Sequence, residues 1–222
     1  MKDKQYAVIG LGRFGASVAT TLSRGGKEVL AIDKDMVSVE RVADVVTKAV
    51  QADGTDIEQL RYLGLEDFDI AIVGFGDQLE ASILTVMNLK ELGVKYILAK
   101  ARNKQYMQIL EKLGANEVVR PEKDMGVKIA KKLLRNRIVD LVEIDGGYSV
   151  VEIKAPKSWI GKTIKILNVR AIYDFNIIGV KKGNDQQIRM SINPDEIIEE
   201  NDQFLLVANT KNIEQFDLIS DK

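Results

Sequence analysis

The amino-acid sequence predicts an α/β fold, with a doubly wound parallel sheet, a linking helix and a smaller α+β domain. Three observations support this prediction. Short apolar runs alternate with helical stretches from residue 5 to about residue 120, which is the pattern of βαβ units. A glycine-rich turn, Gly10-Leu11-Gly12-Arg13-Phe14-Gly15, separates the first apolar run from the first helical stretch. After Pro121 the alternation gives way to one long helix and then mostly short strands.

The elements of the first half follow from apolar runs and from glycines that stop helices. The runs are continuously apolar, as in a sheet covered by helices on both faces. Gly93 and Gly114 close two of the helical stretches. The expected strands are 6–9, 28–32, 46–50, 70–73, 96–99 and 117–119. The expected helices are 13–24, 37–43, one that begins near Thr55, 78–92 and 103–113.

The second half begins with an amphipathic helix over 123–137, which carries Met125, Ile129 and Leu133 along one face. Expected strands follow near 141–145, 149–154, 176–182, 187–191 and 203–208, with helices near 162–171 and 211–219. We therefore divide the chain into a first domain, 1–122, a linking helix, 123–138, and a second domain, 139–222.

Composition restricts the function. The chain has 222 residues, a formal net charge of −1, no cysteine and no histidine. Disulfides, thiolate metal sites and histidine general bases are therefore excluded. The charge balance gives no overall attraction to nucleic acid, and the basic residues Lys128, Lys131, Lys132, Arg135 and Arg137 are typical of one solvated helix face. Since no signal peptide or membrane-spanning run is present, we expect a cytoplasmic protein.

The glycine-rich turn is the strongest functional motif. It follows a strand, opens a helix, and precedes Asp33 at the end of the next strand, which is the context of a Rossmann nucleotide site. Gly10 permits the tight turn, Gly12 lets backbone approach phosphates, and Gly15 lets helix and strand pack closely. Phosphates would then lie on the N–H groups of the helix N-terminus. Asp33 would accept hydrogen bonds from ribose hydroxyls; the alternative is a turn whose glycines serve packing alone.

Several neighbouring residues have two interpretations each. Arg13 reaches a phosphate, in its own site or across a subunit interface, or it is a solvated arginine. Asp35 contacts the ribose or caps the following helix. Asp53 and Thr55 face the adenine, or Thr55 forms a plain capping box with Glu58. The glycines of Gly74-Phe75-Gly76 let a ligand approach the backbone, or they form a simple turn.

Two classes of function use such a fold. An NAD(P)-dependent oxidoreductase needs an acid or base beside the nicotinamide, which here would have to be Lys, Tyr, Asp or Glu. The small, strand-rich second domain shows no obvious convergence of carboxylates with a lysine, so we favour a nucleotide sensor. A small oxidoreductase remains the alternative, and a nucleotide-responsive scaffold without a membrane partner is a further one.

Three segments carry a resemblance to a known family. They are Ala7-Val8-Ile9 with the glycine-rich turn, Leu113-Gly114-Ala115, and Pro121-Glu122-Lys123-Asp124-Met125-Gly126. Together they resemble the cytoplasmic regulatory subunits of Ktr/Trk-type bacterial potassium-uptake systems, over essentially the whole chain. That family has an RCK (regulator of potassium conductance) N-terminal domain followed by an RCK C-terminal domain.

The resemblance implies a non-enzymatic gating ring, an octamer built from dimers and docked beneath a membrane-embedded potassium translocator. Such subunits bind ATP or ADP, and some bind NAD(H). It implies that Arg13 reaches the terminal phosphate of ATP across the dimer interface. It also implies that Glu122 helps to hold a cation such as Mg²⁺, whereas a helix N-terminal acid is the plain alternative. The predicted nucleotide-binding residues are Gly10, Gly12, Arg13, Phe14, Gly15, Asp33, Lys34, Asp53, Thr55, Gly74, Gly76, Lys100 and Glu122.

The resemblance also implies a second ligand, because the C-terminal domain of several relatives binds cyclic di-AMP at its dimer interface. Arg170 would meet a phosphate while isoleucines sandwich the adenine, and ordinary core packing is the alternative for those isoleucines. The chain departs from these relatives at two points: Asn168 stands where an aspartate is often found, and the histidines that some of them carry nearby are missing. The candidate residues are Ile164, Asn168, Arg170, Asn176, Ile177 and Ile178.

Overall fold

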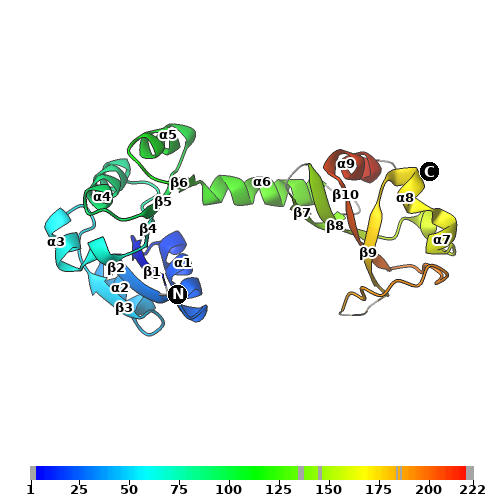
Figure 1. Ribbon diagram of the computed structural model, residues 1–222, viewed down its shortest axis with the longest axis horizontal. Helices are drawn as coiled ribbons and strands as arrows, with labels where there is room; N and C mark the ends of the chain where they lie inside the picture. The colour runs from blue at the N-terminus through cyan, green and yellow to red at the C-terminus, as the bar shows by residue number, and fades with distance from the viewer. Residues whose placement is uncertain (1–3, 135–137, 145–146, 184, 186, 219–222) are drawn as a thin grey trace. The chain divides into compact units, whose positions relative to one another are not determined.

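The computed structural model describes residues 4–134, 138–144, 147–183, 185 and 187–218. The chain divides into two compact units, Met1–Met125 and Gly126–Lys222. Figure 1 shows the parallel sheet with its helices in the first unit and the smaller sheet in the second.

The first unit contains a six-stranded sheet with the order β3-β2-β1-β4-β5-β6, and its neighbouring strands are all parallel. This confirms the predicted doubly wound sheet. The chain reverses its direction of winding between the adjacent strands β1 and β4, so the carboxyl ends of these strands frame the crevice where ligands bind in such folds. The strands are β1 (Gln5–Ile9), β2 (Glu28–Asp33), β3 (Lys48–Gln51), β4 (Ile70–Val73), β5 (Tyr96–Lys100) and β6 (Glu117–Val119).

Helices cover both faces of this sheet. Ala19 of α1 and Val39 of α2 are buried in one apolar cluster, whereas Leu60 of α3, Leu89 of α4 and Leu110 of α5 are buried in another. Each buried leucine stabilises the fold by about 1.5–3 kcal/mol relative to exposure. The helices are α1 (Arg13–Arg24), α2 (Met36–Ala43), α3 (Ile57–Tyr62), α4 (Leu79–Glu91) and α5 (Lys104–Lys112), with a short 3₁₀ turn, η1 (Leu65–Asp67).

The linking helix is α6 (Pro121–Leu134). It begins two residues earlier than predicted because proline suits the first helical turn, where its missing N–H costs nothing. Of the predicted apolar face, Met125 and Ile129 are about half exposed and Leu133 is 81% exposed. Residues 135–137, which include Arg135 and Arg137, lie outside the described residues.

The second unit has a four-stranded antiparallel sheet with the order β7-β8-β10-β9. Its core is aromatic: Trp159 is buried and makes a T-shaped contact with Phe204, at 5.5 Å between ring centroids. Phe216 of α9 packs on Trp159 and Phe175. The elements are β7 (Ile138–Glu143), β8 (Tyr148–Lys154), η2 (Lys157–Trp159), α7 (Ile164–Leu167), α8 (Val169–Tyr173), β9 (Asn176–Lys181), β10 (Gln203–Asn209) and α9 (Thr210–Leu218).

Two element predictions for this unit were wrong. The expected helix over 162–171 is two short helices, because Asn168 between them adopts the left-handed conformation with φ 43°, which asparagine tolerates better than most residues. The expected strand near 187–191 is absent: Arg189 forms only an isolated bridge with Val180. Asp145, the predicted end of the strand at 141–145, lies outside the described residues.

Asp202 organises the segment between β9 and β10. Its side chain is 1% exposed. It accepts hydrogen bonds from the ammonium group of Lys182 (2.7 Å) and from the backbone N–H groups of Gly183 (2.9 Å) and Glu199 (2.8 Å). One buried carboxylate thus fixes three points of an irregular segment that has few ladder hydrogen bonds of its own.

Candidate functional site

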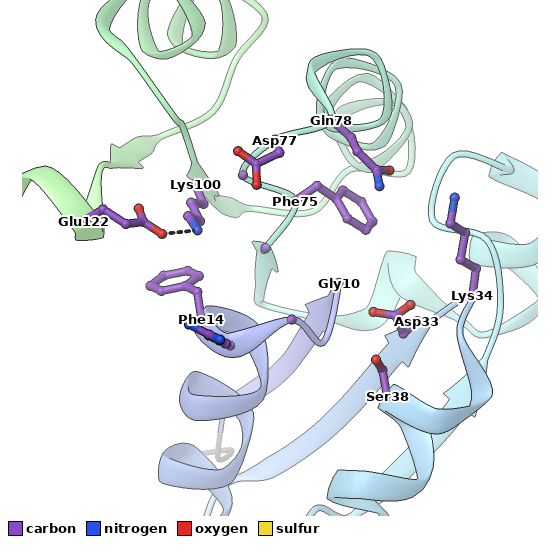
Figure 2. Close-up of a pocket in the computed structure, with 14 residues that line it drawn as sticks. Gly10, Phe14, Asp33, Lys34, Ser38, Phe75, Asp77, Gln78, Lys100 and Glu122 are labelled. Atoms are coloured by element: carbon purple, nitrogen blue, oxygen red, sulfur yellow. Dashed lines mark hydrogen bonds and ion pairs between the residues drawn. The ribbon is translucent and has the colours of Figure 1, made fainter.

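A cleft of about 400 Å³ opens at the carboxyl ends of β1, β2, β4, β5 and β6. Figure 2 shows Asp33, Lys34 and Ser38 on one side of the glycine turn, and Phe14, Lys100 and Glu122 on the other. The cleft brings together predicted residues from five segments of the chain. Its lining consists of Gly10, Gly12, Arg13, Phe14, Asp33, Lys34, Ser38, Gly74, Phe75, Gly76, Asp77, Gln78, Lys100 and Glu122.

Three glycines build the turn by close packing of backbone. Gly10 has φ +91°, a conformation that disfavours other residues. A Cβ atom on Gly15 would lie 1.9 Å from the carbonyl oxygen of Gly10, and one on Gly74 would lie 2.5 Å from the same oxygen. The β1–α1 turn therefore packs against helix α1 and against the end of β4, and Gly15 and Gly74 are required for that packing.

Gly12 differs from these three. No atom lies within 4 Å of the position that its Cβ would occupy, so the protein itself does not require a glycine there. Gly12 is the N-cap of α1 and makes no side-chain capping hydrogen bond. Its missing side chain leaves open space beside the free N–H groups and positive dipole end of the helix, and this space suits a phosphate.

Asp33 contacts the same turn from the end of β2. One carboxylate oxygen accepts a hydrogen bond from the Leu11 N–H (2.6 Å), and the other accepts one from the Asp35 N–H (2.9 Å). Each carboxylate oxygen has a second acceptor position. Asp33 therefore shapes the glycine-rich turn and can still accept hydrogen bonds from ribose hydroxyls.

Two open alternatives are resolved by hydrogen bonds. Asp35 caps α2, since its carboxylate accepts from the N–H of Ser38 (3.1 Å) and from the Ser38 hydroxyl (2.8 Å); these bonds lower the pKa of Asp35. The predicted capping box at Thr55 was wrong, because Asp56 is the N-cap of α3 and accepts from the Glu58 and Gln59 N–H groups.

Thr55 instead donates its N–H and its hydroxyl to Asp53, at 2.9 and 2.7 Å, and these two bonds lower the pKa of Asp53. Both residues line a smaller hollow of about 80 Å³ together with Lys34, Phe75 and Gln78. Because the last three also line the main cleft, Asp53 and Thr55 lie beside its Asp33 end.

Lys100 and Glu122 form an ion pair at the opposite end of the cleft. The ammonium nitrogen of Lys100 lies 2.6 Å from a carboxylate oxygen of Glu122 and 6.0 Å from the centre of the Phe14 ring. The hydrogen bond from Lys100 lowers the pKa of Glu122. A Cβ atom on Gly76 would lie 2.7 Å from the Lys100 side chain, so this glycine makes room for the lysine.

Ser38, Asp77 and Gln78 were not predicted from the sequence as lining residues. Phe75 was considered only as the middle residue of the Gly74-Phe75-Gly76 turn. The available signal was position: Phe75, Asp77 and Gln78 follow the end of β4, whose carboxyl end meets the cleft. The lining includes three cations, Arg13, Lys34 and Lys100, and three carboxylates, Asp33, Asp77 and Glu122. A polyphosphate would therefore enter a cleft with a balanced charge.

Of the candidate cyclic di-AMP residues in the second unit, some lie in the core and others on the surface. Ile164 and Ile177 pack against the aromatic core, which supports their interpretation as core residues. Arg170 and Asn176 are exposed, and so is Asn168 in the turn between α7 and α8. Ile178 is half-buried in β9.

Two family models match the chain. The TrkA-N domain matches residues 6–121, and the TrkA-C domain matches residues 148–219. The chain belongs to the TrkA-N and TrkA-C domain family. The first model covers the six-stranded sheet from Tyr6 onward and every lining residue of the cleft except Glu122, and the second covers β8, β9, β10 and the helices that pack on them. The resemblance to Ktr/Trk-type regulatory subunits is thereby confirmed.

Individual relatives agree with this assignment. Ktr system potassium uptake protein A of Bacillus subtilis is 41% identical over 217 residues, which are 98% of this chain and 97% of that protein. The GsuK RCK domain shares the fold, with a TM-score of 0.67 at 15% identity, and the match covers all of this chain and 48% of that chain. The GsuK channel bound to NAD has a TM-score of 0.56 at 23% identity, over 98% of this chain and 38% of that one.

Proposed function

We propose that this chain is the nucleotide-sensing regulatory subunit of a potassium-uptake system and binds ATP and ADP in the cleft. The observation that carries the proposal is the open space at Gly12, beside the N-terminus of α1 and within reach of Asp33. This open space occurs in a chain that matches a potassium uptake protein over nearly the whole length of both proteins. Residues 1–122 would sense the nucleotide, and 139–222 would bind a second ligand and dimerise.

The cleft suggests how a nucleotide would lie. The ribose would meet Asp33, the adenine would lie towards Asp53 and Thr55, and the phosphates would extend past Gly12 towards Lys100. NADH is a second candidate ligand, because a protein of the same fold, the GsuK channel, is bound to NAD. We favour ATP and ADP because the cations Arg13 and Lys100 lie where a chain of phosphates would end.

The residues of the cleft would bind a hard cation only when the nucleotide is also bound. Among residues 4–134 and the other described segments, no three acidic side chains gather closely enough to hold a metal ion alone. Glu122 would supply one carboxylate oxygen to Mg²⁺ or a similar ion, and phosphate oxygens and water would supply the rest. When bound, the cation would neutralise part of the phosphate charge beside Asp77 and Glu122.

The assembly that we propose is a homodimer that builds an octameric ring beneath a membrane-embedded potassium translocator. The support is the apolar surface of α6, where Met125, Ile129 and Leu133 are 51–81% exposed and a second copy would cover them. Within the part of the chain that the structure describes, no helix has the length and apolarity to cross a membrane. Because the chain matches a Ktr system potassium uptake protein over nearly its whole length, we place the subunit in the cytoplasm, at the membrane through its partner.

Nucleotide sensing then requires two ring geometries with different affinities for ATP and ADP, since equal affinity shifts no population. The γ-phosphate supplies the difference if Arg13 of one subunit pairs with it in the neighbour's cleft. Arg13 is exposed at the start of α1 and lines the cleft. Binding would change the geometry of the ring and so the state of the translocator, without any chemical conversion of the nucleotide.

Substitution of Arg13 with alanine tests this role. We expect the ratio of ATP to ADP affinity to fall by about tenfold, because a charge-assisted hydrogen bond to the γ-phosphate is lost. Isothermal titration of the purified protein with each nucleotide measures the ratio. Arg24→Ala, at the other end of α1, is the matched control. An unchanged ratio in Arg13→Ala would rule out the proposed role of Arg13.

We also propose a cyclic di-AMP site in the second unit, built around exposed Arg170 and Asn176 with Asn168 and Ile178 beside them. Titration of Arg170→Ala with cyclic di-AMP should show binding weakened by about tenfold or more, because one phosphate loses its cation. Lys157→Ala, in η2 of the same unit, serves as the control. Binding of equal strength in Arg170→Ala and wild type would remove this site from the proposal.

A further inference from the structure

Lys100 is the enclosed cation of the cleft. Its side chain is 14% exposed, whereas Arg13 and Lys34 are exposed. Three segments hold its ammonium group: Phe14 of α1 lies beneath it, Gly76 makes room for it after β4, and Glu122 of α6 accepts its hydrogen bond (Figure 2). The position of the lysine is therefore set by packing as well as by charge.

Glu122, its partner, is held much less firmly. The Glu122 side chain is 71% exposed and lies in the first turn of α6. An ion pair with one partner largely in water contributes little to stability, whereas a phosphate oxygen on an ammonium group forms a strong charge-assisted hydrogen bond. An anion that reaches Lys100 should therefore displace Glu122 and leave the lysine in place.

We infer that Lys100 is a specificity-determining residue, which exchanges Glu122 for the terminal phosphate of a triphosphate and thereby releases the first turn of α6. This inference rests on the proposed binding of adenine nucleotides in the cleft. A diphosphate anchored by its ribose at Asp33 is shorter by one phosphate and leaves the Lys100–Glu122 pair intact. The Lys100–Glu122 pair thus makes the contact between α6 and the cleft depend on whether the bound nucleotide carries two or three phosphates.

Lys100→Met tests the inference, because methionine keeps much of the length of the side chain beside Gly76 and removes the charge. We expect the ATP to ADP affinity ratio to fall by about tenfold in isothermal titrations. Lys34→Met is the matched control, since Lys34 lines the same cleft at the Asp33 end. Lys34→Met should weaken the binding of ATP and of ADP by the same factor. Thermal unfolding of each variant checks that the fold is kept.

Glu122→Gln provides an opposite test. In EDTA no divalent cation can bind the Glu122 carboxylate. Because the carboxylate competes with the terminal phosphate for Lys100, its loss should tighten ATP binding by roughly three- to tenfold and leave ADP binding unchanged. In the same EDTA buffer, where no cation can tie Glu122 back to the phosphates, deuterium uptake of the wild-type segment 121–134 should rise with ATP and stay constant with ADP. In Glu122→Gln without nucleotide it should already match the ATP-bound wild type.

Different results would refute the nucleotide site and the exchange at Lys100. If wild-type protein binds neither ATP nor ADP, the proposed function is wrong. If both bind but Lys100→Met keeps the wild-type affinity ratio, or if ATP and ADP give the same deuterium uptake over 121–134, the exchange at Lys100 is wrong and the nucleotide site stands.

Discussion

Gly12→Ala is expected to weaken ATP and ADP binding by at least about tenfold while the free energy of unfolding changes by less than about 0.5 kcal/mol. The new methyl group meets no protein atom within 4 Å, and the φ of −60° at Gly12 is open to alanine. The methyl group enters the space beside the N-terminus of α1 instead, where the phosphates would lie. Isothermal titration and calorimetric unfolding measure the two quantities.

Gly15→Ala is the matched control and should behave in the opposite way. Its Cβ would lie 1.9 Å from the carbonyl oxygen of Gly10, so either the turn or helix α1 must move. We expect a loss of roughly 3 kcal/mol or more in unfolding free energy. If Gly12→Ala keeps full affinity for both nucleotides, the phosphates do not lie on the start of α1.

Asp202→Ala is expected to destabilise the second unit by roughly 3 kcal/mol, the largest effect we predict for a single side chain outside the cleft. The substitution leaves the mostly buried ammonium of Lys182 without its closest carboxylate, and it leaves the Gly183 and Glu199 N–H groups without their acceptor. Denaturant unfolding followed by the fluorescence of Trp159, the single tryptophan of the chain, reports on this unit.

Asp195→Ala is the control for this prediction. Asp195 pairs with Lys165 at 3.5 Å, but both side chains are more than 70% exposed, so the change should stay within about 0.5 kcal/mol. Equal stabilities of the two variants would show that Asp202 does not lock the segment between β9 and β10.

The sequence predicted the first unit well because its fold depends on features that are local in the chain. Continuous apolar runs give strands that are covered on both faces, and glycines end the helices between them. Most residues of the cleft could also be predicted, since the carboxyl ends of parallel strands converge at the switch between β1 and β4, but Ser38, Phe75, Asp77 and Gln78 were missed. The contact of Lys100 with Glu122 could not be predicted, because it depends on how β5 and α6 meet in space.

The errors arose where one side chain outweighed a pattern. At α3, Asp56 provides a better cap than Thr55 because its carboxylate accepts from two N–H groups at once. Asn168 broke an apparently continuous helix by adopting φ 43°. The segment around Arg189 was expected to be a strand, but it makes only one isolated bridge, with Val180.

The hydrogen bond from the Leu11 N–H to Asp33 has a consequence for the rate of nucleotide exchange. Because the carboxylate already holds the turn in its binding shape, an arriving nucleotide orders little backbone, and association loses little conformational entropy. Such preorganised sites differ from one ligand to another mainly in their dissociation rates. The lifetime of the bound state, rather than the speed of capture, would then set how quickly the subunit follows a changing ATP to ADP ratio.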